Sequence, residues 1–336
     1  MTLRIALYSS KRPRCGIATY TDYLEGALRA EGSEVRHWGS QSPAHVLPQI
    51  AAWNPAVFHV QHEQAIMPPS EVLLKFANEL FAAGGRNVLT LHTETPSSAY
   101  LAAKKAFSAT IVHKPPALLR EAHILPMPCP VQDGPGDRPA LRRKYAFPED
   151  AFVVSTLGFM LPWKKTVEIA EHLLPWVSGD KKIHLQIMAS QHFNPNQVEF
   201  MQRSSRKLEE FSSSVGGRIR HVAHYPPDRE ILERLLLSDL GYVYCPFDTG
   251  SASAAASVFV SARCPLVTSN STHYDHLMCH TVRVSKEDIA RFGRTVVDTA
   301  RDPDLLLRLR ERSEFLYAQT NYREFARRHG RIYGDL

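Results

Sequence analysis

The stretch of the chain that decides its fold is GYVYCPFDTGSASAAASVFVSARCPLVTS, residues Gly241–Ser269. It opens on an apolar run (Gly241–Pro246), continues through a loop (Phe247–Gly250) and a run of small residues (Ser251–Ala262), and closes on a second apolar run (Pro265–Ser269). Short apolar runs bounded by turn residues are typical of buried strands, and the small residues between them suit a helix. The stretch therefore predicts a β-α-β unit of a parallel sheet.

The loop of this unit has the composition of a phosphate site. Backbone N–H groups and hydroxyls at the positive end of a helix bind phosphate oxygens. The groups that the sequence places there are Thr249, Gly250, Ser251 and Ser253. The carboxylate of Asp248 would repel a bare phosphate but could reach a neutral hydroxyl, so the predicted ligand carries a phosphate and a polar, uncharged portion. An ordinary β-α-β unit with a serine-capped helix is the alternative that this stretch alone leaves open.

Composition and charge narrow the class of protein. With 336 residues the chain exceeds the usual size of a single core, so two domains are expected. A net charge of +6 favours anionic ligands or surfaces without requiring nucleic acid. The five cysteines are scattered and form no C-x-x-C pair, which is typical of a reducing, cytoplasmic setting. No apolar run is long enough to span a bilayer, and the N-terminal MTLRIALYSS is predicted to be a strand, not a signal peptide.

Strand and helix patterns alternate on both sides of a linker, Pro126–Pro139, which is rich in Pro, Gly and Asp. In the first half, the predicted strands Val57–Val60 and Asn87–Leu91 each end in polar residues. Such strand ends are typical of an open parallel sheet, whose ligands bind at the carboxyl ends of the strands. We therefore predict an α/β protein with two doubly wound, Rossmann-like domains that face each other across a cleft.

Two glycines mark further candidate phosphate contacts. Gly16 lies in a basic loop after the first strand and allows the backbone to approach a ligand closely. The loop lacks the G-x-G-x-x-G fingerprint, so a dinucleotide is not indicated. Gly158 is predicted to form a turn at the end of a strand, with Lys164 following it as a point charge for a diphosphate. A solvated lysine at the start of a helix is the alternative.

Two histidines end predicted strands of the first half, each beside a carboxylate. His62 precedes Glu63, and His92 is followed shortly by Glu94. A histidine in such a place can donate a proton to a substrate hydroxyl, or accept one from it, near neutral pH. A half-buried structural histidine is the alternative for both positions.

Other motifs fail on spacing. His62–Ile66 begins like H-E-x-x-H but lacks the second histidine, and the cluster within His273–His280 has no matching second pair of zinc ligands. Asp302–Asp304 precedes a helix and fits an N-cap followed by proline. The basic run Arg142–Lys144 has no interleaved aromatic residues, so a solvated face is expected. The sequence thus predicts no metal site.

Together these features resemble the GT-B glycosyltransferases, and specifically family 4 of retaining enzymes that use nucleotide sugars. The resemblance spans nearly the whole chain. The segments that carry it are CGIATYTDYLEGAL (Cys15–Leu28), VFHVQHE (Val57–Glu63), VLTLHTE (Val88–Glu94), STLGFMLPWKK (Ser155–Lys165), HVAHYPPDREILERLLLSDLGYVYCPFDTGSAS (His221–Ser253) and TNYREFARRHGRIYGDL (Thr320–Leu336). It implies an acceptor domain at 1–130, a donor domain at 131–315, and a C-terminal helix at 316–336 that packs back on the first domain.

The resemblance also implies roles for single residues. Lys164 matches the lysine that binds the donor diphosphate, and His92 matches the histidine near the reacting sugar. Gly16 matches the glycine of the loop close to the phosphates. Asp248 stands at the first of two paired glutamates of the family, which gives it a catalytic role with a shorter side chain.

Two positions depart from the family pattern. Phe159 stands where the family has an arginine shortly before the lysine, so one positive charge is missing. Ala256 replaces the second paired glutamate, which usually bonds to the nucleotide ribose. Ser251 and Ser253 would then carry more of the phosphate contact, and the ribose would be recognised elsewhere or more weakly.

The resemblance implies transfer of a sugar from a nucleoside-diphosphate sugar to an acceptor hydroxyl, with retention and without metal or cofactor. The acceptor side would be formed by His62, Glu63 and Glu94. A glycan, a lipid-linked or a small-molecule acceptor all fit, as does peripheral contact with an anionic inner membrane face, and a nucleic-acid acceptor is left open though disfavoured. Two alternatives remain: a non-catalytic GT-B-like partner protein, or an enzyme like the nucleotide-sugar 2-epimerases.

Overall fold

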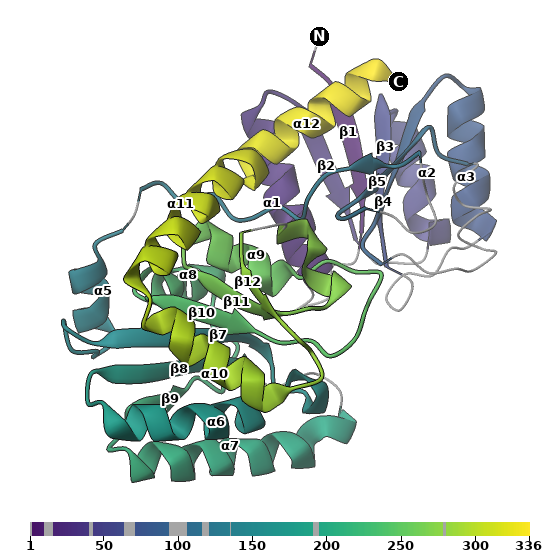
Figure 1. The fold of residues 1–336 in the computed structure, drawn as a ribbon. Coiled ribbons are helices and arrows are strands. Elements are labelled where there is room, and N and C mark those ends of the chain that lie inside the picture. Colours follow the sequence, from purple (N-terminus) through teal and green to yellow (C-terminus); the bar gives the residue numbers. More distant parts are fainter. Residues whose placement is uncertain are drawn as a thin grey trace. The chain divides into compact units, whose positions relative to one another are not determined.

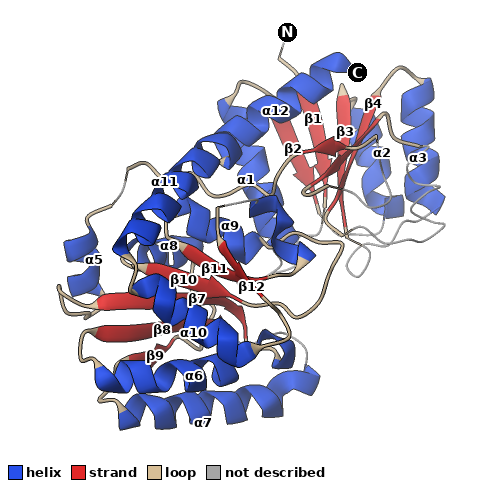
Figure 2. Cartoon of the chain, viewed as in Figure 1, coloured by secondary structure: helices blue, strands red, loops and turns tan. Residues whose placement is uncertain are grey.

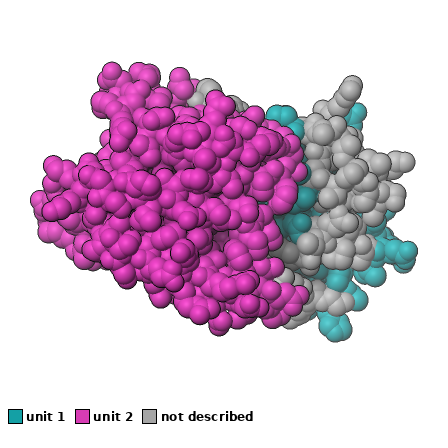
Figure 3. All heavy atoms as spheres, turned by 60° about the horizontal axis from the view of Figure 1, so that its bottom comes forward, with its two compact units in different colours: residues 1–130, 249–252, 319–336 teal, residues 131–248, 253–318 magenta. Residues whose placement is uncertain are grey.

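Two compact units, each built on a parallel sheet with flanking helices, make up the chain (Figures 1 and 2). The computed structural model describes residues 2–9, 16–39, 43–63, 71–93, 106–115, 121–134, 136–190, 195–277 and 280–336. Unit 1 comprises Met1–Pro130, Thr249–Ala252 and Gln319–Leu336, and unit 2 comprises Val131–Asp248 and Ser253–Ala318 (Figure 3). The last helix of the chain is therefore part of the first unit.

Unit 1 contains a six-stranded sheet in the order β2-β1-β3-β4-β5-β6, with every neighbouring pair parallel. Its strands are β1 (Arg4–Tyr8), β2 (Glu34–Trp38), β3 (Val57–His62), β4 (Arg86–Leu91), β5 (Ala109–Val112) and β6 (His123–Ile124). Its helices are α1 (Gly16–Ala30), α2 (Pro43–Trp53), α3 (Glu71–Ala82) and α12 (Tyr322–Asp335). α1 contacts α12, and α2 contacts α3, so the two pairs cover opposite faces of the sheet (Figure 1).

Alternation along the strands determines which residues each helix pair covers. Phe58 and Val60 of β3, with Leu89 and Leu91 of β4, pack in the apolar core beneath α2 and α3. Because successive side chains of a strand point to opposite faces, the intervening residues point toward α1 and α12. On β3 one of these is His59, which is fully buried. One face of the sheet is thus apolar, and the other carries buried polar residues among its apolar ones.

Unit 2 contains a second six-stranded parallel sheet in the order β12-β11-β10-β7-β8-β9. Its strands are β7 (Phe152–Phe159), β8 (Ile183–Ser190), β9 (Ile219–His221), β10 (Leu240–Val243), β11 (Leu266–Ser269) and β12 (Val282–Val284). Its α-helices are α5 (Arg138–Lys144), α6 (Thr166–Gly179), α7 (Val198–Ser214), α8 (Asp228–Leu236), α9 (Ala254–Ser261), α10 (Ile289–Ala300) and α11 (Pro303–Thr320), the end of which passes into unit 1. α6 contacts α7 and α10, whereas α8 contacts α5 and α9.

The deciding stretch forms the predicted β-α-β unit. β10 and β11 are parallel neighbours, and α9 connects them. The helix begins at Ala254 instead of Ser251, because Ser253 is its N-cap and accepts a hydrogen bond from the Ala256 N–H at 3.2 Å. Small residues recur here because helix and strand lie close together. A Cβ on Gly241 would lie 2.2 Å from Cε1 of Phe259, which is fully buried on α9.

Gly241→Ala is therefore expected to destabilise unit 2 by about 3 kcal/mol, because a methyl group has no room beside Phe259. Urea unfolding of the variant measures this cost. Gly179→Ala is the matched control: Gly179 ends α6, and a Cβ there would meet nothing within 4 Å. The control should change the free energy of unfolding by less than about 1 kcal/mol, in the stabilising direction. Equal stabilities of the two variants would contradict the packing explanation.

In the basic run Arg142–Lys144, the side chains of Arg143 and Lys144 are exposed as predicted, but the prediction of a solvated face is wrong for Arg142. Arg142 is buried, and its Nη2 donates to Asp239 Oδ2 at 2.7 Å. Asp239 also accepts from Arg138 at 2.9 Å and from the Val153 N–H at 2.8 Å. A buried cation needs such partners, so this arginine fastens α5 to the sheet.

Candidate functional site

The strand order of unit 2 predicts a ligand site at the carboxyl ends of β7 and β10. The chain runs outward from β7 to β8 and β9 and then returns to form β10 on the other side of β7. In open parallel sheets, ligands bind outside the carboxyl ends of the strands at such a reversal. The segment that leaves β7 carries Lys164, and the segment that leaves β10 carries Cys245 and Asp248.

Lys164 is the cation of this site. It ends a 3-10 turn, η1 (Pro162–Lys164), and its half-buried side chain lies near the Cys245 thiol. Burial lowers the pKa of the Lys164 ammonium, an effect that Cys245 partly opposes. Within the described part of the chain this ammonium makes no hydrogen bond or ion pair. A half-buried cation without a partner is unfavourable, so a bound anion would stabilise it.

Lys165 lies in a different environment from its neighbour. Its backbone adopts a left-handed conformation, with φ 53°, and its ammonium pairs with Glu168 at 3.0 Å. The turn therefore gives the two adjacent lysines different environments: Lys165 is paired with Glu168 at the start of α6, whereas the Lys164 ammonium has no such partner among the described residues.

Gly158 does not form the predicted turn. It lies inside β7 in register with Ala189, with nearly extended backbone at φ 157°. A Cβ on Gly158 would meet nothing within 4 Å, so space is open beside it. The next residue, Phe159, ends the strand, and its ring lies 6.1 Å from that of Tyr225, centroid to centroid. An aromatic pair thus occupies the place where the resemblance implied an arginine.

The start of α9 remains a candidate phosphate contact, with one change. The Ser253 hydroxyl is already used as the N-cap, whereas the first N–H groups of a helix lack partners within the helix. Ala256 is fully buried, and its methyl group offers a ligand no hydrogen bond in place of the missing glutamate.

Asp248 already has partners for both carboxylate oxygens. Oδ1 accepts from the Thr272 N–H at 3.0 Å, and Oδ2 lies 2.5 Å from the Lys286 ammonium. Its charge is therefore balanced by Lys286, and the carboxylate holds the loop after β10 to the segment after β11. The catalytic role inferred for Asp248 stays a prediction, and it requires the carboxylate to exchange one of these partners for a substrate hydroxyl.

Unit 1 holds the remaining part of the glycine and serine loop, Thr249–Ala252. Thr93, just after β4, forms an antiparallel bridge with Ser251, and the Thr249 hydroxyl lies 3.1 Å from that of Ser251. Lys114, just after β5, is buried and donates to the carbonyl oxygen of Thr249. The sequence interpretation missed Lys114, although it follows a strand in the same way as His62 and His92 do.

His92 lies at the carboxyl end of β4 and is almost completely buried. Its Nε2 is 3.1 Å from Oε1 of Gln61, and the Tyr20 ring of α1 packs edge-on against it at 4.7 Å. Burial, the nearby His113 and then His62 lower the pKa of His92 well below its usual value. The ring is therefore neutral at physiological pH. Its other nitrogen, Nδ1, makes no hydrogen bond within the described residues.

His92 belongs to a buried polar layer that the sequence interpretation did not foresee. The layer lies on the sheet face that α1 and α12 cover. It consists of His59, Gln61, Thr90, His92 and His113 from the sheet, Tyr20 from α1, and His329 and Tyr333 from α12. The available signal was the pattern VFHVQH in β3, in which the polar residues His59 and Gln61 are two positions apart and so share one face of the strand.

For the other candidate residues of the first half, the structure gives the position in the fold and the burial, except for Glu94. His62 ends β3, is buried, and has its pKa lowered to about 4 by burial. Glu63 follows it and is half-buried. Gly16 is exposed as the first residue of α1, and a Cβ on it would meet nothing within 4 Å. Glu94 lies outside the described residues.

Among the described residues, one group of three metal-ligating side chains comes close enough to hold an ion: Asp22, Glu25 and His37 of unit 1, with ligand atoms within 4.8 Å of one another. None of these was a candidate residue. His276, from the cluster considered for zinc, instead has its Nε2 3.3 Å from the Ser257 hydroxyl. Cys279, from the same cluster, lies outside the described residues.

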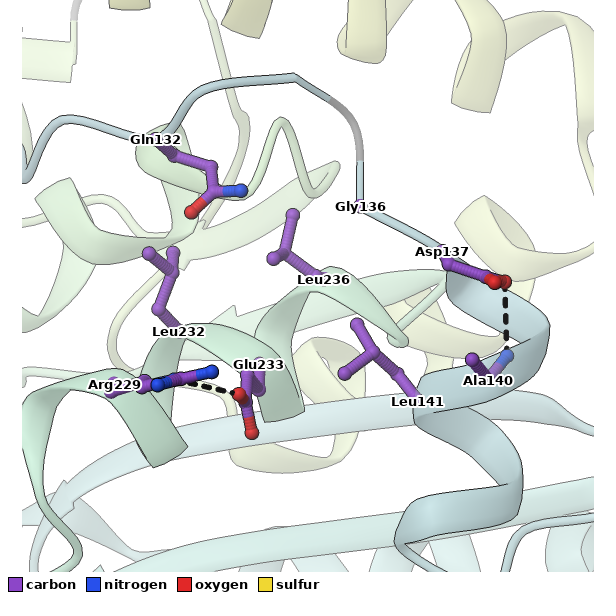
Figure 4. A pocket seen from close by; sticks show the side chains of 9 residues that line it. All are labelled: Gln132, Gly136, Asp137, Ala140, Leu141, Arg229, Leu232, Glu233 and Leu236. Atoms are coloured by element: carbon purple, nitrogen blue, oxygen red, sulfur yellow. Dashed lines mark hydrogen bonds and ion pairs between the residues drawn. The ribbon is translucent and has the colours of Figure 1, made fainter.

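A pocket of about 280 Å³ in unit 2 lies away from these residues (Figure 4). Leu141, Leu232 and Leu236 line it together with the ion pair of Arg229 and Glu233. It is formed by α5 and by one face of α8, from Arg229 to Leu236, and these two helices lead into the amino ends of β7 and β10. Because ligands of such sheets bind at the carboxyl ends, this pocket is not part of the candidate site.

The two parallel six-stranded units have the GT-B glycosyltransferase fold. A glycosyltransferase from Rickettsia africae matches with a TM-score of 0.77 and 11% identity over 99% of this chain and 98% of its own. HepE from Anabaena, in complex with UDP-glucose, matches with a TM-score of 0.70 and 10% identity, over 99% of this chain and 100% of its own.

A third structure is an α,α-trehalose-phosphate synthase (UDP-forming) from Burkholderia xenovorans in complex with glucose-6-phosphate. It matches with a TM-score of 0.67 and 14% identity, over 98% of this chain and 100% of its own. No protein-family model and no curated protein sequence matches the chain. At these identities the likeness defines the fold and not the substrate. In the described part of the chain, no helix is both long and apolar enough to cross a membrane.

Proposed function

We propose that this chain is a glycosyltransferase that moves a hexose-type sugar from a nucleoside-diphosphate sugar to an acceptor hydroxyl. The bond between the anomeric carbon and the diphosphate oxygen breaks, a bond from the acceptor oxygen to that carbon forms, and the proton of the acceptor hydroxyl passes to the leaving diphosphate. The observation that carries the proposal is Lys164, a half-buried ammonium without a partner among the described residues, at the strand reversal of a GT-B fold. The negative charge of a diphosphate would pair with this ammonium.

Lys164 acts on the leaving group. Negative charge develops on the diphosphate as the glycosidic bond breaks, and a fixed cation in a partly desolvated site stabilises that charge. The first N–H groups of α9, at the positive end of the helix dipole, also stabilise the negative charge of the diphosphate. These protein groups offset the charge of the diphosphate, and we propose that transfer needs no metal and proceeds with retention.

His92 acts on the sugar as a hydrogen-bond acceptor. Its lowered pKa makes it a weak base, so it is poorly suited to hold the proton of the acceptor hydroxyl. With Nε2 bonded to Gln61, the lone pair of Nδ1 can accept a hydrogen bond from a sugar hydroxyl. This interaction orients the sugar instead of storing a proton.

Uridine nucleotides are the first donors to test, since two structures of the same fold are described with UDP-glucose or as UDP-forming. We propose a sugar or sugar phosphate as acceptor, in line with the glucose-6-phosphate in the Burkholderia complex. Peripheral contact with an anionic membrane would suit the net charge of +6 and a lipid-linked acceptor equally well.

A thermal-shift panel of nucleoside diphosphates, their sugars and nucleoside monophosphates tests the donor class. A ligand at a hundred times its Kd stabilises the folded protein by about 2.7 kcal/mol, enough to measure as a rise in Tm. We expect a nucleoside diphosphate to stabilise the protein more than its monophosphate, because Lys164 recognises the diphosphate. No stabilisation by any diphosphate or nucleotide sugar would contradict the proposed function.

A non-catalytic partner protein is the second candidate, and two observations favour it. Phe159 and Tyr225 pair where an arginine was implied, and the position of the missing glutamate, Ala256, is fully buried. Both changes remove donor contacts. Turnover of any nucleotide sugar, including slow hydrolysis of the donor, would exclude this candidate.

A further inference from the structure

A chain of hydrogen bonds crosses the buried polar layer of unit 1 and ends at His92. The hydroxyl of Tyr333, on α12, lies 2.7 Å from Nδ1 of His59. Nε2 of His59 lies 3.1 Å from the amide nitrogen of Gln61, and the Gln61 carbonyl oxygen lies 3.1 Å from Nε2 of His92. Thr90 places its hydroxyl 2.8 Å from the same His59 nitrogen. All five side chains are buried.

The chemistry of the Gln61 amide determines where each proton lies. An amide nitrogen only donates, so Nε2 of His59 is the acceptor and carries no proton. A neutral His59 then has its proton on Nδ1 and donates it to the Tyr333 hydroxyl oxygen. At the other end, an amide oxygen only accepts, so His92 carries its proton on Nε2. The two histidines thus hold opposite tautomers, coupled through one amide.

We propose that Gln61, His59 and Tyr333 are positioning residues that fix the tautomer of His92, so that its Nδ1 presents a lone pair to the site. Reversing the Gln61 amide would move the proton of both histidines: His92 would present an N–H, and His59 would accept from the Tyr333 hydroxyl. The hydroxyls of Thr90 and Tyr333 can each donate or accept, so the Gln61 amide, whose two ends differ, decides which tautomers the two histidines adopt.

Burial makes this arrangement stable across physiological pH. The pKa values of His59 and His92 both lie well below the usual range, and desolvation is the largest cause for each. Neither ring gains a second proton near neutral pH. Each histidine therefore stays uncharged, and only the nitrogen that carries its proton can change. The pKa of Tyr333 is raised well above its usual value by burial, so its hydroxyl keeps its proton.

The far end of the chain lies on the last helix. α12 packs against α1 within unit 1, and Arg86 of β4 donates to the backbone carbonyl of Tyr333. The C-terminal helix therefore contributes a functional group as well as covering the sheet. That its effect reaches substrate rests on the proposed function, in which the Nδ1 of His92 accepts a hydrogen bond from a sugar hydroxyl.

Nitrogen NMR of protein labelled with ¹⁵N-histidine tests the tautomers directly and needs no substrate. Signals are assigned with His59→Gln and His92→Gln. We expect wild-type His92 to be protonated on Nε2 and His59 on Nδ1. Gln61→Met, which keeps the side-chain length, should let His92 populate both tautomers, and Tyr333→Phe should change the signals of both histidines. His329, which donates to the Phe325 carbonyl at 2.9 Å, should keep its signals as an internal reference.

Tyr242→Phe is the matched control, because Tyr242 is a buried tyrosine of unit 2 whose hydroxyl has no hydrogen bond among the described residues. It should leave the His92 signals unchanged. Wild-type His92 protonated on Nδ1, or His92 signals that stay unchanged in either Gln61→Met or Tyr333→Phe, would overturn the proposal.

Kinetics separate this proposal from the proposed function. Gln61→Met should lower kcat about tenfold or more with a smaller change in donor KM, because a mixed tautomer presents an N–H where an acceptor is needed. A wild-type protein that turns over no nucleotide sugar would overturn the proposed function while the tautomers stand. Active wild type with unaltered kcat in Gln61→Met would overturn the positioning role.

Discussion

Lys164→Ala is expected to lower kcat/KM for the nucleotide-sugar donor about 100- to 1,000-fold. The reason is the partnerless ammonium at the strand reversal of unit 2, whose pKa burial lowers. A hydrogen-bond donor of the protein that interacts with a developing negative charge stabilises the transition state by about 3–4 kcal/mol. Alanine removes the positive charge of the ammonium, so that only water and the remaining protein groups stabilise the diphosphate.

The same change should not destabilise the unliganded protein. Removing a half-buried cation that has no partner removes a desolvation cost, so the free energy of unfolding should stay the same or rise. This separates a ligand-binding lysine from a structural one. Urea unfolding without ligand and initial rates with donor measure the two effects on one preparation.

Lys165→Ala is the matched control for Lys164→Ala. It removes the same charge one residue away, but this ammonium is already paired with Glu168. A partly exposed pair of this kind contributes about 0–1 kcal/mol, so kcat/KM should change less than about threefold. Equal effects of the two alanine variants would show that only the general positive charge of this turn matters, and would contradict the role given to Lys164.

Lowering the pH from 7 to 5 is expected to destabilise unit 1 by several kcal/mol, before most carboxylates titrate. Its buried histidines have pKa values depressed below the usual 6.5, and those of His113 and His329 fall to about 4 and about 3 because of burial. In the unfolded chain these rings bind protons below pH 6.5, whereas in the folded chain they do not. Stability is therefore full above pH 6.5 and is lost as the pH falls toward the folded pKa values.

The size of the effect follows from the depressed pKa values. From pH 6.5 to pH 5 each such histidine costs about 2 kcal/mol, since one pKa unit corresponds to 1.36 kcal/mol. His113 and His329 together account for about 4 kcal/mol, and His59 and His92 act in the same direction. Hydrogen exchange of peptides from α12, measured at both pH values, reports the opening free energy of unit 1.

His329→Leu should reduce this acid sensitivity by about 2 kcal/mol, because it removes one of the buried rings that must stay neutral. The matched control is His45→Leu, which replaces an exposed histidine on α2 of the same unit. The control should keep the full difference between pH 7 and pH 5. An unchanged pH dependence in His329→Leu would show that these rings do not cause the acid sensitivity.

The fold could be predicted from local patterns, which also indicate a candidate site at the carboxyl ends of the strands. The stretch Gly241–Ser269 forms its β-α-β unit because apolar runs and small residues decide strand and helix locally. Lys164 could be singled out as a candidate because a lysine near the start of a helix is electrostatically unfavourable without another role. These signals lie within a few residues of the groups that they concern.

The buried polar layer could not be predicted in the same way. The sequence interpretation took the polar residues that follow Val60 as facing a ligand, yet Gln61 points to the face that α12 covers. The partner of His59 there is Tyr333, 274 residues away in the chain. A hydrogen bond over that separation leaves no local pattern. The N-cap role of Ser253 and the pairing of Asp248 with Lys286 depend on tertiary contacts in the same way.

The central claim is that Lys164 serves sugar transfer from a nucleotide sugar. The most direct test is the release of nucleoside diphosphate from the donor that stabilises the protein most, measured with wild type, Lys164→Ala and Lys165→Ala in parallel. We predict release by wild type and Lys165→Ala, with a rate that is lower by a factor of about 100 or more for Lys164→Ala. Release that is equally fast in Lys164→Ala, or absent in wild type for every nucleotide sugar, would contradict the account.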